Sequence, residues 1–197
     1  MTLEILLGLM LFAFASSITP GPNNLMLMTS GVNFGFARTL PHMLGVSLGF
    51  VLMAILVGLG VMQLFDAYPV TYEILKVLSV LYMLYLAYKI ANSSGNMNSK
   101  KPRSTPMSFL QAVMFQWVNP KAWTMALTAI SVYAPSKNLY AVVVVSVIFG
   151  LVNFPCITCW VTLGTKIKHL LTQPKRLKIF NYTMAILLVL SLYPIFI

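Results

Sequence analysis

Acidic side chains are scarce in this sequence of 197 residues, which contains three Asp and Glu residues in total against 13 Lys and Arg residues. Charged residues of both signs make up 8% of the chain, whereas soluble domains average about 25%. The two cysteines are too few for the disulfide framework of a small secreted domain. These shortages exclude a separate cytoplasmic enzyme domain, a disordered regulator and a disulfide-stapled module.

Hydrophobic residues, by contrast, make up 59% of the chain and gather in long runs. A transmembrane helix needs about 20 predominantly apolar residues, and six runs are long enough. They are about Ile5 to Met28, Leu40 to Leu64, Tyr72 to Ile90, Met107 to Ile130, Leu139 to Leu163 and Ile179 to Ile197. The sequence therefore predicts an all-α, polytopic membrane protein in which residues 1–197 form a single transmembrane domain of six helices.

Most basic residues lie in the loops after the first, third and fifth runs. These are Arg38, Lys89, Lys100, Lys101, Arg103, Lys166, Lys168, Lys175, Arg176 and Lys178. The opposite side carries Glu4, Asp66, Glu73, Lys76 and Lys137. The positive-inside rule then predicts that the basic loops are cytoplasmic and that both termini lie on the opposite side of the membrane. Basic residues spread over short loops do not form the continuous face that nucleic acid requires, so no nucleic-acid partner is expected.

The segment 92–106 is rich in Ser, Asn, Lys and Pro and is the natural linker between two halves, about 1–91 and 107–197. Three spans per half is an odd number, so two structural repeats would be inverted relative to each other across the membrane. Pro20 and Pro120 lie 100 residues apart, each within the first run of its half. The sequence therefore predicts two inverted three-helix repeats, with chance similarity between apolar helices as the alternative.

Small residues recur at a spacing of four in the second run of each half. Gly45 and Gly49 form one such pair, and Ser146 and Gly150 form another, 101 residues further on. Small residues at this spacing allow two helix backbones to approach closely. We therefore expect Gly45, Gly49 and Gly150 to lie at helix–helix contacts.

The string Thr19-Pro20-Gly21-Pro22-Asn23-Asn24 interrupts the first apolar run. Its two prolines cannot donate backbone hydrogen bonds, so the carbonyls of Ser16 and Ile18 lose their helical partners. Broken backbone at membrane depth is tolerated only where protein, water or a ligand supplies partners. The asparagines are candidates to cap the second half-helix, and its N-terminal amides would attract a carboxylate. The break therefore indicates a cavity.

A second interruption, Gln116-Trp117-Val118-Asn119-Pro120-Lys121, divides the fourth run. Lys121 is a charge well inside an apolar run, where it costs about 2.5–3.5 kcal/mol at the centre of a helix. A substrate carboxylate or a nearby carbonyl would offset this cost, or the side chain would reach the interface. Paired broken helices point to a transporter site near the midplane. Two proline kinks with asparagines that bond neighbouring helices are the alternative.

The first interruption resembles the T-P-G-P-N motif in the first helix of the lysine exporter (LysE/Rht) family of bacterial amino-acid exporters. The segments Gly31 to Arg38, Gly45 to Gly49 and Val118 to Lys121 fall where that family has a glycine-rich loop, a second-helix glycine pair and an N-P-K motif. Within the family, three stretches look most like the cysteine and O-acetylserine exporter branch: Gly45 to Phe50, Gln116 to Asn119, and Cys159-Trp160. The resemblance covers the whole chain. It implies two inverted three-helix repeats, export of small amino acids or their derivatives, and coupling to protons. It also implies a place in the bacterial inner (cell) membrane, so that both termini are expected to be periplasmic.

We therefore predict secondary-active export by alternating access at broken helices one and four. The predicted substrate-binding residues are Pro20, Gly21, Pro22, Asn23, Asn24, Gln116, Asn119, Pro120 and Lys121. In this hypothesis the amides at Asn23 and Asn24 and the charge of Lys121 hold the substrate carboxylate, while the carbonyls freed by the prolines receive its ammonium. Asp66 is the candidate for proton coupling. Proton transport by the substrate amino group itself is the alternative.

Two other functions stay open at this point. Cys156 and Cys159 form a C-x-x-C pair that would suit a membrane thiol-redox protein, and a non-transporting assembly protein would need only helix packing. Asn153 and Pro155 beside the cysteines are candidates to line the cavity. No Ser-His-Asp set, Walker loop or zinc spacing occurs, so we expect no enzyme, no cofactor and no metal. His42 is expected to be solvated or to cap a helix. Whether the protein forms a homo-oligomer stays open.

Overall fold

The computed structural model describes residues 1–93, 105–134 and 138–193, except for the side chains of Met62, Leu64 and Asp66. Every secondary-structure element of the described residues is a helix. The helices are α1 (Leu3–Ile18), α2 (Pro22–Phe34), α3 (Phe36–Gly58), α4 (Val61–Ala67), α5 (Pro69–Ala91), α6 (Phe109–Val118), α7 (Pro120–Tyr133), α8 (Leu139–Lys168) and α9 (Pro174–Leu190). The all-α prediction is confirmed.

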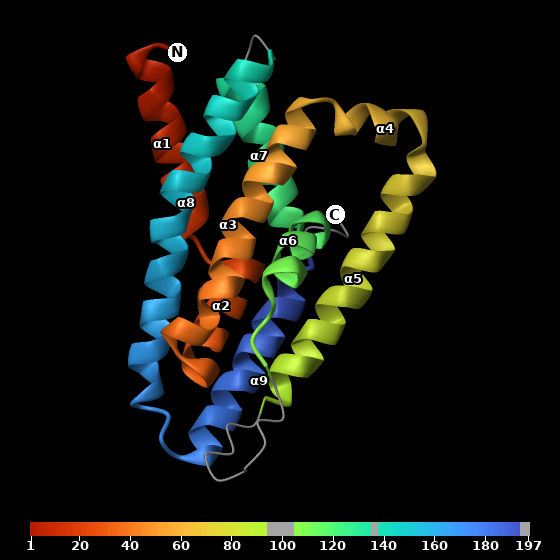
Figure 1. Cartoon of the computed structure of the whole chain (residues 1–197). Coiled ribbons are helices and arrows are strands. Elements are labelled where there is room, and N and C mark those ends of the chain that lie inside the picture. Colours follow the sequence, from red (N-terminus) through yellow and green to blue (C-terminus); the bar gives the residue numbers. More distant parts are fainter. Residues whose placement is uncertain (94–104, 135–137, 194–197) are drawn as a thin grey trace.

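The helices run back and forth along one bundle axis (Figure 1). The pair α1 and α2 leads from one end of the bundle to the other, α3 returns, and α5 leads back again. The pair α6 and α7 then follows the direction of α3, α8 runs against it, and α9 runs with it. The helices α2, α5 and α8 therefore finish at one end of the bundle, and the N-terminus and α4 lie at the other.

Three helices of the described residues, α3, α5 and α8, are long and apolar enough to span a membrane. The pair α1 and α2 meets the same criterion when it is counted together, although it is bent by 55° at its break. The helix α6 is a shorter apolar helix of 10 residues. Length and composition thus support three or four spans within the described part of the chain, out of the six that the sequence predicts.

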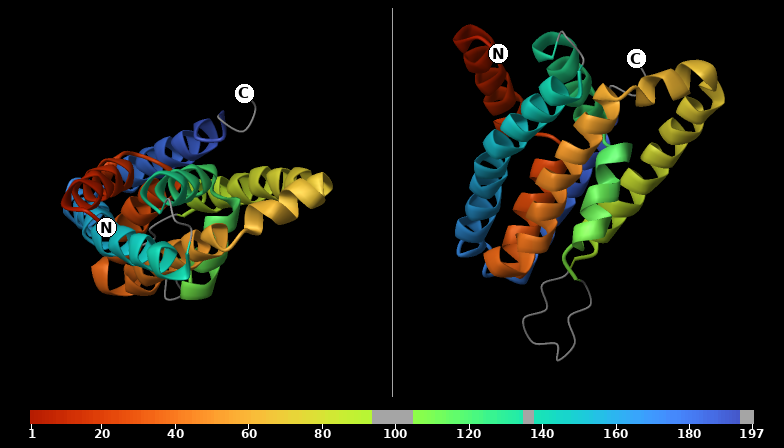
Figure 2. Two further views of the ribbon diagram at one scale, coloured as in Figure 1. Left: turned by 90° about the horizontal axis from the view of Figure 1, so that it is seen from above. Right: turned by 45° about the horizontal axis from the view of Figure 1, so that its top comes forward.

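The second predicted span ends earlier than its apolar run. The helix α3 stops at Gly58, and Gly60 adopts a φ of 104°, a left-handed conformation that glycine reaches without strain. The chain then turns into α4, which lies across the end of the bundle and leads to α5 at its edge (Figure 2). The apolar run continues past this turn, so hydropathy alone did not predict that the helix ends at Gly58.

The apolar core forms two clusters that lie at successive levels of the bundle. One cluster joins α2, α3, α5, α6, α8 and α9, and the other joins α1, α3, α7 and α8. Large apolar side chains also point outward, including Leu11 and Leu151, each 69% exposed, and Ile186, 58% exposed. Extensive outward-facing apolar surface is typical of a protein whose solvent is lipid. The chain is a multi-pass membrane protein.

Each broken helix packs against an unbroken helix from the other half of the chain: α2 against α8, and α6 against α3. Glycines permit the close approach. A Cβ atom at Gly49 of α3 would lie 2.7 Å from the Cα of Val113 in α6, and one at Gly31 of α2 would lie 2.5 Å from the carbonyl oxygen of Val161 in α8. Gly45 likewise faces α6, whereas Gly150 faces α3.

The expectation for His42 was wrong. The helix α3 begins at Phe36 and continues through Pro41, so His42 lies inside the helix rather than at its start. Its side chain is only 1% exposed. The apolar run in the sequence begins at Leu40, and that late beginning misplaced the helix start by about one turn.

Candidate functional site

The first helix break is closed by side chains of the protein itself. Of the two carbonyls that Pro20 and Pro22 free from helical bonding, that of Ser16 accepts a hydrogen bond from Thr19 Oγ1 at 3.0 Å, and that of Ile18 accepts one from Trp160 Nε1 at 3.1 Å. Carbonyls that lose their helical partner inside a membrane protein need another one. These two carbonyls are therefore already occupied in this conformation, contrary to the idea that they stand ready for a substrate ammonium.

Asn24 fixes the geometry of the break. Its side-chain Nδ2 donates to the carbonyls of Ser17 and Thr19, both at 2.8 Å, and the residue is almost completely buried. One amide thus joins the end of α1 to the start of α2. Asn24 holds the bent pair together and does not cap α2.

The N-terminus of α2 has no side-chain cap among the described residues. Gly21 occupies the N-cap position in an extended conformation, and Pro22 follows without an N–H group. The next amides, at Asn23 and Asn24, belong to the first turn, whose N–H groups carry the positive end of the helix dipole. This helix start therefore favours an anionic group.

The second break is built differently, because its own asparagine caps the helix that follows. Asn119 Oδ1 accepts a hydrogen bond from the amide of Lys121 at 3.2 Å. The Asn119 amide in turn donates to the carbonyl of Gln116 at 3.3 Å, which is the carbonyl that Pro120 frees. The start of α7 is thereby satisfied without any contribution from the other half of the chain.

Lys121 reaches from the second break to the first. Its Nζ donates to the carbonyl oxygen and the hydroxyl of Thr19, both at 2.8 Å, and to the carbonyl of Pro20 at 3.2 Å. The carbonyls at the end of α1 carry the negative end of that helix dipole, so a cation is stabilised there. The carbonyls of Thr19 and Pro20 thus offset the cost of placing the Lys121 charge inside an apolar helix. A nearby carbonyl was one of the alternatives that the sequence left open.

Gly21 makes room for the lysine side chain. A Cβ atom at this position would lie 2.6 Å from Lys121 Cδ and 3.2 Å from Nζ. The φ of Gly21 is −177°, which any residue adopts, so the backbone conformation does not require glycine here. The space that Lys121 occupies explains the glycine between the two prolines.

Asn23 and Gln116 form a second polar link between the halves. Asn23 Nδ2 donates to Gln116 Oε1 at 2.8 Å, and Gln116 Nε2 donates to Asn23 Oδ1 at 3.3 Å. Gln116 Nε2 also donates to the carbonyl of Ala112 in α6, and the residue has no exposed surface. Paired amides can exchange these bonds for bonds to a ligand without leaving buried groups unsatisfied.

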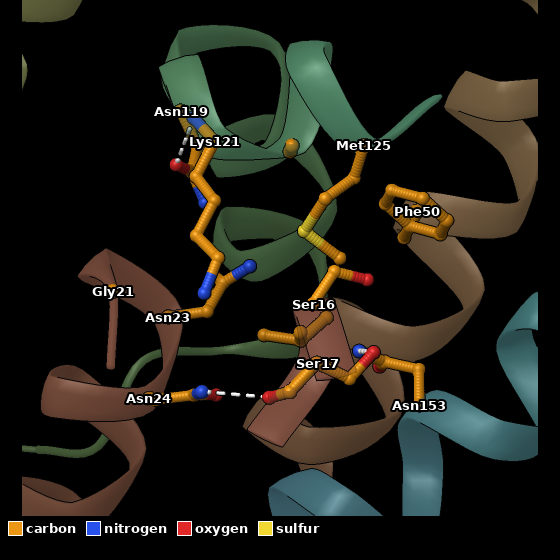
Figure 3. A pocket seen from close by; sticks show the side chains of 12 residues that line it. Ser16, Ser17, Gly21, Asn23, Asn24, Phe50, Asn119, Lys121, Met125 and Asn153 are labelled. Carbon is orange, nitrogen blue, oxygen red and sulfur yellow. Dashed lines mark hydrogen bonds between the residues drawn. The ribbon is translucent and has the colours of Figure 1, made fainter. Parts of the chain in front are cut away.

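A small polar cavity lies between the two breaks, and residues of α1, α2, α3, α7 and α8 line it (Figure 3). Its volume is about 20 Å³, which is room for about one water molecule. Among the described side chains that line the cavity, Lys121 is the charged one. The complete lining is Ser16, Ser17, Gly21, Asn23, Asn24, Val46, Phe50, Asn119, Lys121, Ala122, Met125 and Asn153.

Asn153 of α8 presents an unused acceptor in this cavity. Its Nδ2 donates to Ser17 Oγ at 3.0 Å, while its Oδ1 is buried without a hydrogen-bond partner in the described structure. An unpaired buried carbonyl oxygen is costly, so it indicates a site that a ligand or water completes. Ser16 and Ser17 were not predicted, because small hydroxyl residues are common inside transmembrane helices.

The remaining predicted residues shape the site or lie away from it. Pro20, Pro22 and Pro120 cause the breaks but do not line the cavity. Pro155, expected beside Asn153, does not line it either. Asp66 belongs to α4 at the end of the bundle, and its side chain lies outside the described residues. On α8, Cys156 is buried and Cys159 is exposed, and both are free thiols.

Two interrupted helices that meet around a polar cavity, inside a bundle with an apolar exterior, define a membrane transporter. The family model of the LysE type translocators matches residues 13–191, and the chain belongs to this family. The protein is therefore a transporter and not an enzyme.

Named relatives extend over the full length of the chain. It is 29% identical over 198 residues to the cysteine/O-acetylserine efflux protein of Escherichia coli strain K12, and the match covers 100% of both chains. The protein of the same name from Shigella sonnei strain Ss046 has the same identity and coverage. No solved structure matches the chain.

Proposed function

We propose that this protein exports a small amino acid or derivative, of the cysteine and O-acetylserine kind, across the bacterial inner membrane. The observation that carries the proposal is the approach of Lys121 to Thr19 and Pro20, which brings a cation and an uncapped helix start to one polar cavity. The carboxylate of a small amino acid complements both of these positive groups. The full-length relatives named as efflux proteins support the direction of transport and the class of substrate.

The substrate carboxylate binds at the positive side of the cavity. There it accepts hydrogen bonds from Lys121 Nζ and from the first-turn amides at Asn23 and Asn24. The ammonium binds at the opposite side, where Asn153 Oδ1 lacks a partner and the Ser17 hydroxyl lies beside it. This arrangement revises the hypothesis from the sequence, in which the carbonyls freed by the prolines receive the ammonium.

The chain crosses the membrane six times as two inverted three-helix repeats. The pairs α1–α2 and α6–α7 each count as one crossing, and α9 is the last. The pairing of helices supports this topology, because α2 contacts α8 while α6 contacts α3, and the third helices α5 and α9 contact each other. Inverted repeats would produce such reciprocal pairing. The basic junctions after α2, α5 and α8 are cytoplasmic, and both termini are periplasmic.

Transport proceeds by alternating access. A cavity of about 20 Å³ is too small for an amino acid, so this conformation corresponds to a contracted state of the site. Opening requires the bonds from Lys121 to Thr19 and from Asn23 to Gln116 to be exchanged for bonds to the substrate. The described lining contains no carboxylate, which favours the substrate amino group over Asp66 as the carrier of the coupled proton.

The test is efflux of labelled cysteine and O-acetylserine from preloaded proteoliposomes, with and without an imposed proton gradient. We expect the gradient to stimulate efflux, and we expect Asn23→Ala to abolish it, because Gln116 and the substrate both lose a partner. Asn92→Ala is the matched control, since Asn92 is an exposed residue at the end of α5 whose side chain donates to the carbonyl of Tyr88 in its own helix.

The outcomes separate the parts of the proposal. Efflux of a different amino acid from a small panel would retain the exporter and discard the substrate class. Equal efflux from Asn23→Ala and Asn92→Ala would overturn the site, and efflux that ignores the gradient would overturn proton coupling. Failure to move any amino acid would overturn the proposed function.

A further inference from the structure

A second and larger cavity lies near the end of the bundle where α2 and α5 finish. Its volume is about 60 Å³, three times that of the central cavity. His42 of α3 lines it, and both ring nitrogens are buried without a hydrogen-bond partner in the described part of the chain. Because the residue is only 1% exposed, bulk water does not satisfy them. A buried imidazole without partners in a cavity wall indicates a ligand.

The two cavities follow each other along the same helices. On α2, Asn23 lines the central cavity and Thr29 lines the second one, about two turns further on. On α3, Phe50 and Val46 line the central cavity and His42 lines the second. Along the second broken helix, Gln111 lines the second cavity and Asn119 lines the central one, and Gln116, the partner of Asn23, comes between them in the chain. A molecule that left the second cavity along α2 would therefore meet this pair and then Lys121.

The lining of the second cavity suits a small zwitterion. Lys89, in the last turn of α5, is the charged group among its described lining residues, and Asp and Glu are absent from that set. Thr29, Asn33 and Gln111 supply neutral polar groups, and Tyr82 supplies an aromatic face. In its neutral form an imidazole offers one acceptor nitrogen, to which an ammonium donates, and a tyrosine ring attracts the same cation.

We propose that this cavity is a loading site, in which His42 and Tyr82 hold the ammonium of the amino acid and Lys89 holds its carboxylate before the substrate reaches the central cavity. The inference rests on the proposed function, because it assumes the same substrate. The loading site lies at the end of the bundle that carries the basic junctions, where an exported molecule starts its passage.

The binding test uses the two histidines of the chain, His42 and His169. Protein with isotope-labelled histidine is placed in nanodiscs and titrated with O-acetylserine, with serine amide as a probe that lacks the carboxylate. We expect a saturable change in the His42 ring signals and none at His169, which lies in the basic junction. His169→Gln assigns the signals. The change should persist in Asn23→Ala, because the central cavity is a separate site.

The transport test uses substitutions at His42. His42→Phe keeps an aromatic ring but removes both nitrogens, and we expect it to raise the KM for efflux about tenfold with little change in kcat, the size expected for one lost hydrogen bond to a charged group. His42→Gln restores a polar acceptor and should recover most of the affinity. His169→Gln is the matched control and should leave KM unchanged.

Two results would overturn the loading site: His42 signals that ignore O-acetylserine, or a His42→Phe variant with the wild-type KM. If either occurs while efflux remains sensitive to Asn23→Ala, only the loading site fails. If wild-type protein moves no amino acid at all, the proposed function fails with it. Equal responses to O-acetylserine and serine amide would remove Lys89 from the site.

Discussion

The two helix breaks look alike in the sequence but are built in different ways. The second break has one proline, and Asn119 caps the helix that follows, so α7 starts with its own bonds complete. The first break has two prolines, no side-chain cap in the described structure and a bend of 55°. Its carbonyls bind side chains of the break itself and, in addition, Trp160 and Lys121 from the other half of the chain. The second break therefore holds Lys121 at a capped helix start, and the first break supplies the carbonyls that bind its ammonium group.

Removal of the charge should have the largest effect. Lys121→Met deletes the link between the breaks and the cation for the substrate carboxylate, and we expect kcat/KM for efflux to fall roughly 100-fold, equivalent to about 3 kcal/mol. The measurement is efflux from proteoliposomes that contain equal amounts of folded protein. Lys76→Met in α5 is the control, because this lysine does not line either cavity. Efflux within a factor of three of wild type would mean that transport does not depend on the link from Lys121 to the first break.

Gly21→Ala should act on the same link from the other side. The new Cβ would lie 2.6 Å from Lys121 Cδ, and the flexible lysine can move aside, so we expect the fold to survive and kcat/KM for efflux to fall roughly tenfold. The double variant with Lys121→Met provides the control. If Gly21 serves only to make room for the lysine, the double variant will be no worse than Lys121→Met alone. Additive losses would contradict that role.

The smallest effect is expected from the cap of the second break. Asn119→Ala should lower the free energy of unfolding by about 1 kcal/mol, as for other N-caps, with a smaller loss of efflux than either variant above. Denaturation in mixed micelles measures this change, and Asn119→Ser should restore it. Asn138→Ala removes the equivalent cap of α8, at an exposed position, and should leave efflux intact. Unchanged stability of Asn119→Ala would contradict the role of Asn119 as the cap that stabilises the start of α7.

Much of the site could be predicted from the sequence, because proline interrupts a helix wherever it occurs and a polar side chain inside an apolar run needs a partner. The prolines located both breaks, and the isolated charge identified Lys121. The sequence could not reveal that the freed carbonyls already have partners, because Trp160, which bonds Ile18, lies 142 residues away in the chain. It also provided no reason to place His42 inside the bundle, since a histidine beside Pro41 is typical of a helix end.

The sequence by itself determined the class of the protein and the position of its backbone interruptions. Apolar run length fixes which segments can cross a bilayer, and a proline removes a hydrogen bond wherever it is placed. Only the tertiary structure decided which groups meet. Asn153 reaches Ser17, and Lys121 reaches Thr19, because α8 and α7 pack against α1. Contacts between distant segments depend on how whole helix faces fit together, and that fit is a property of the folded bundle.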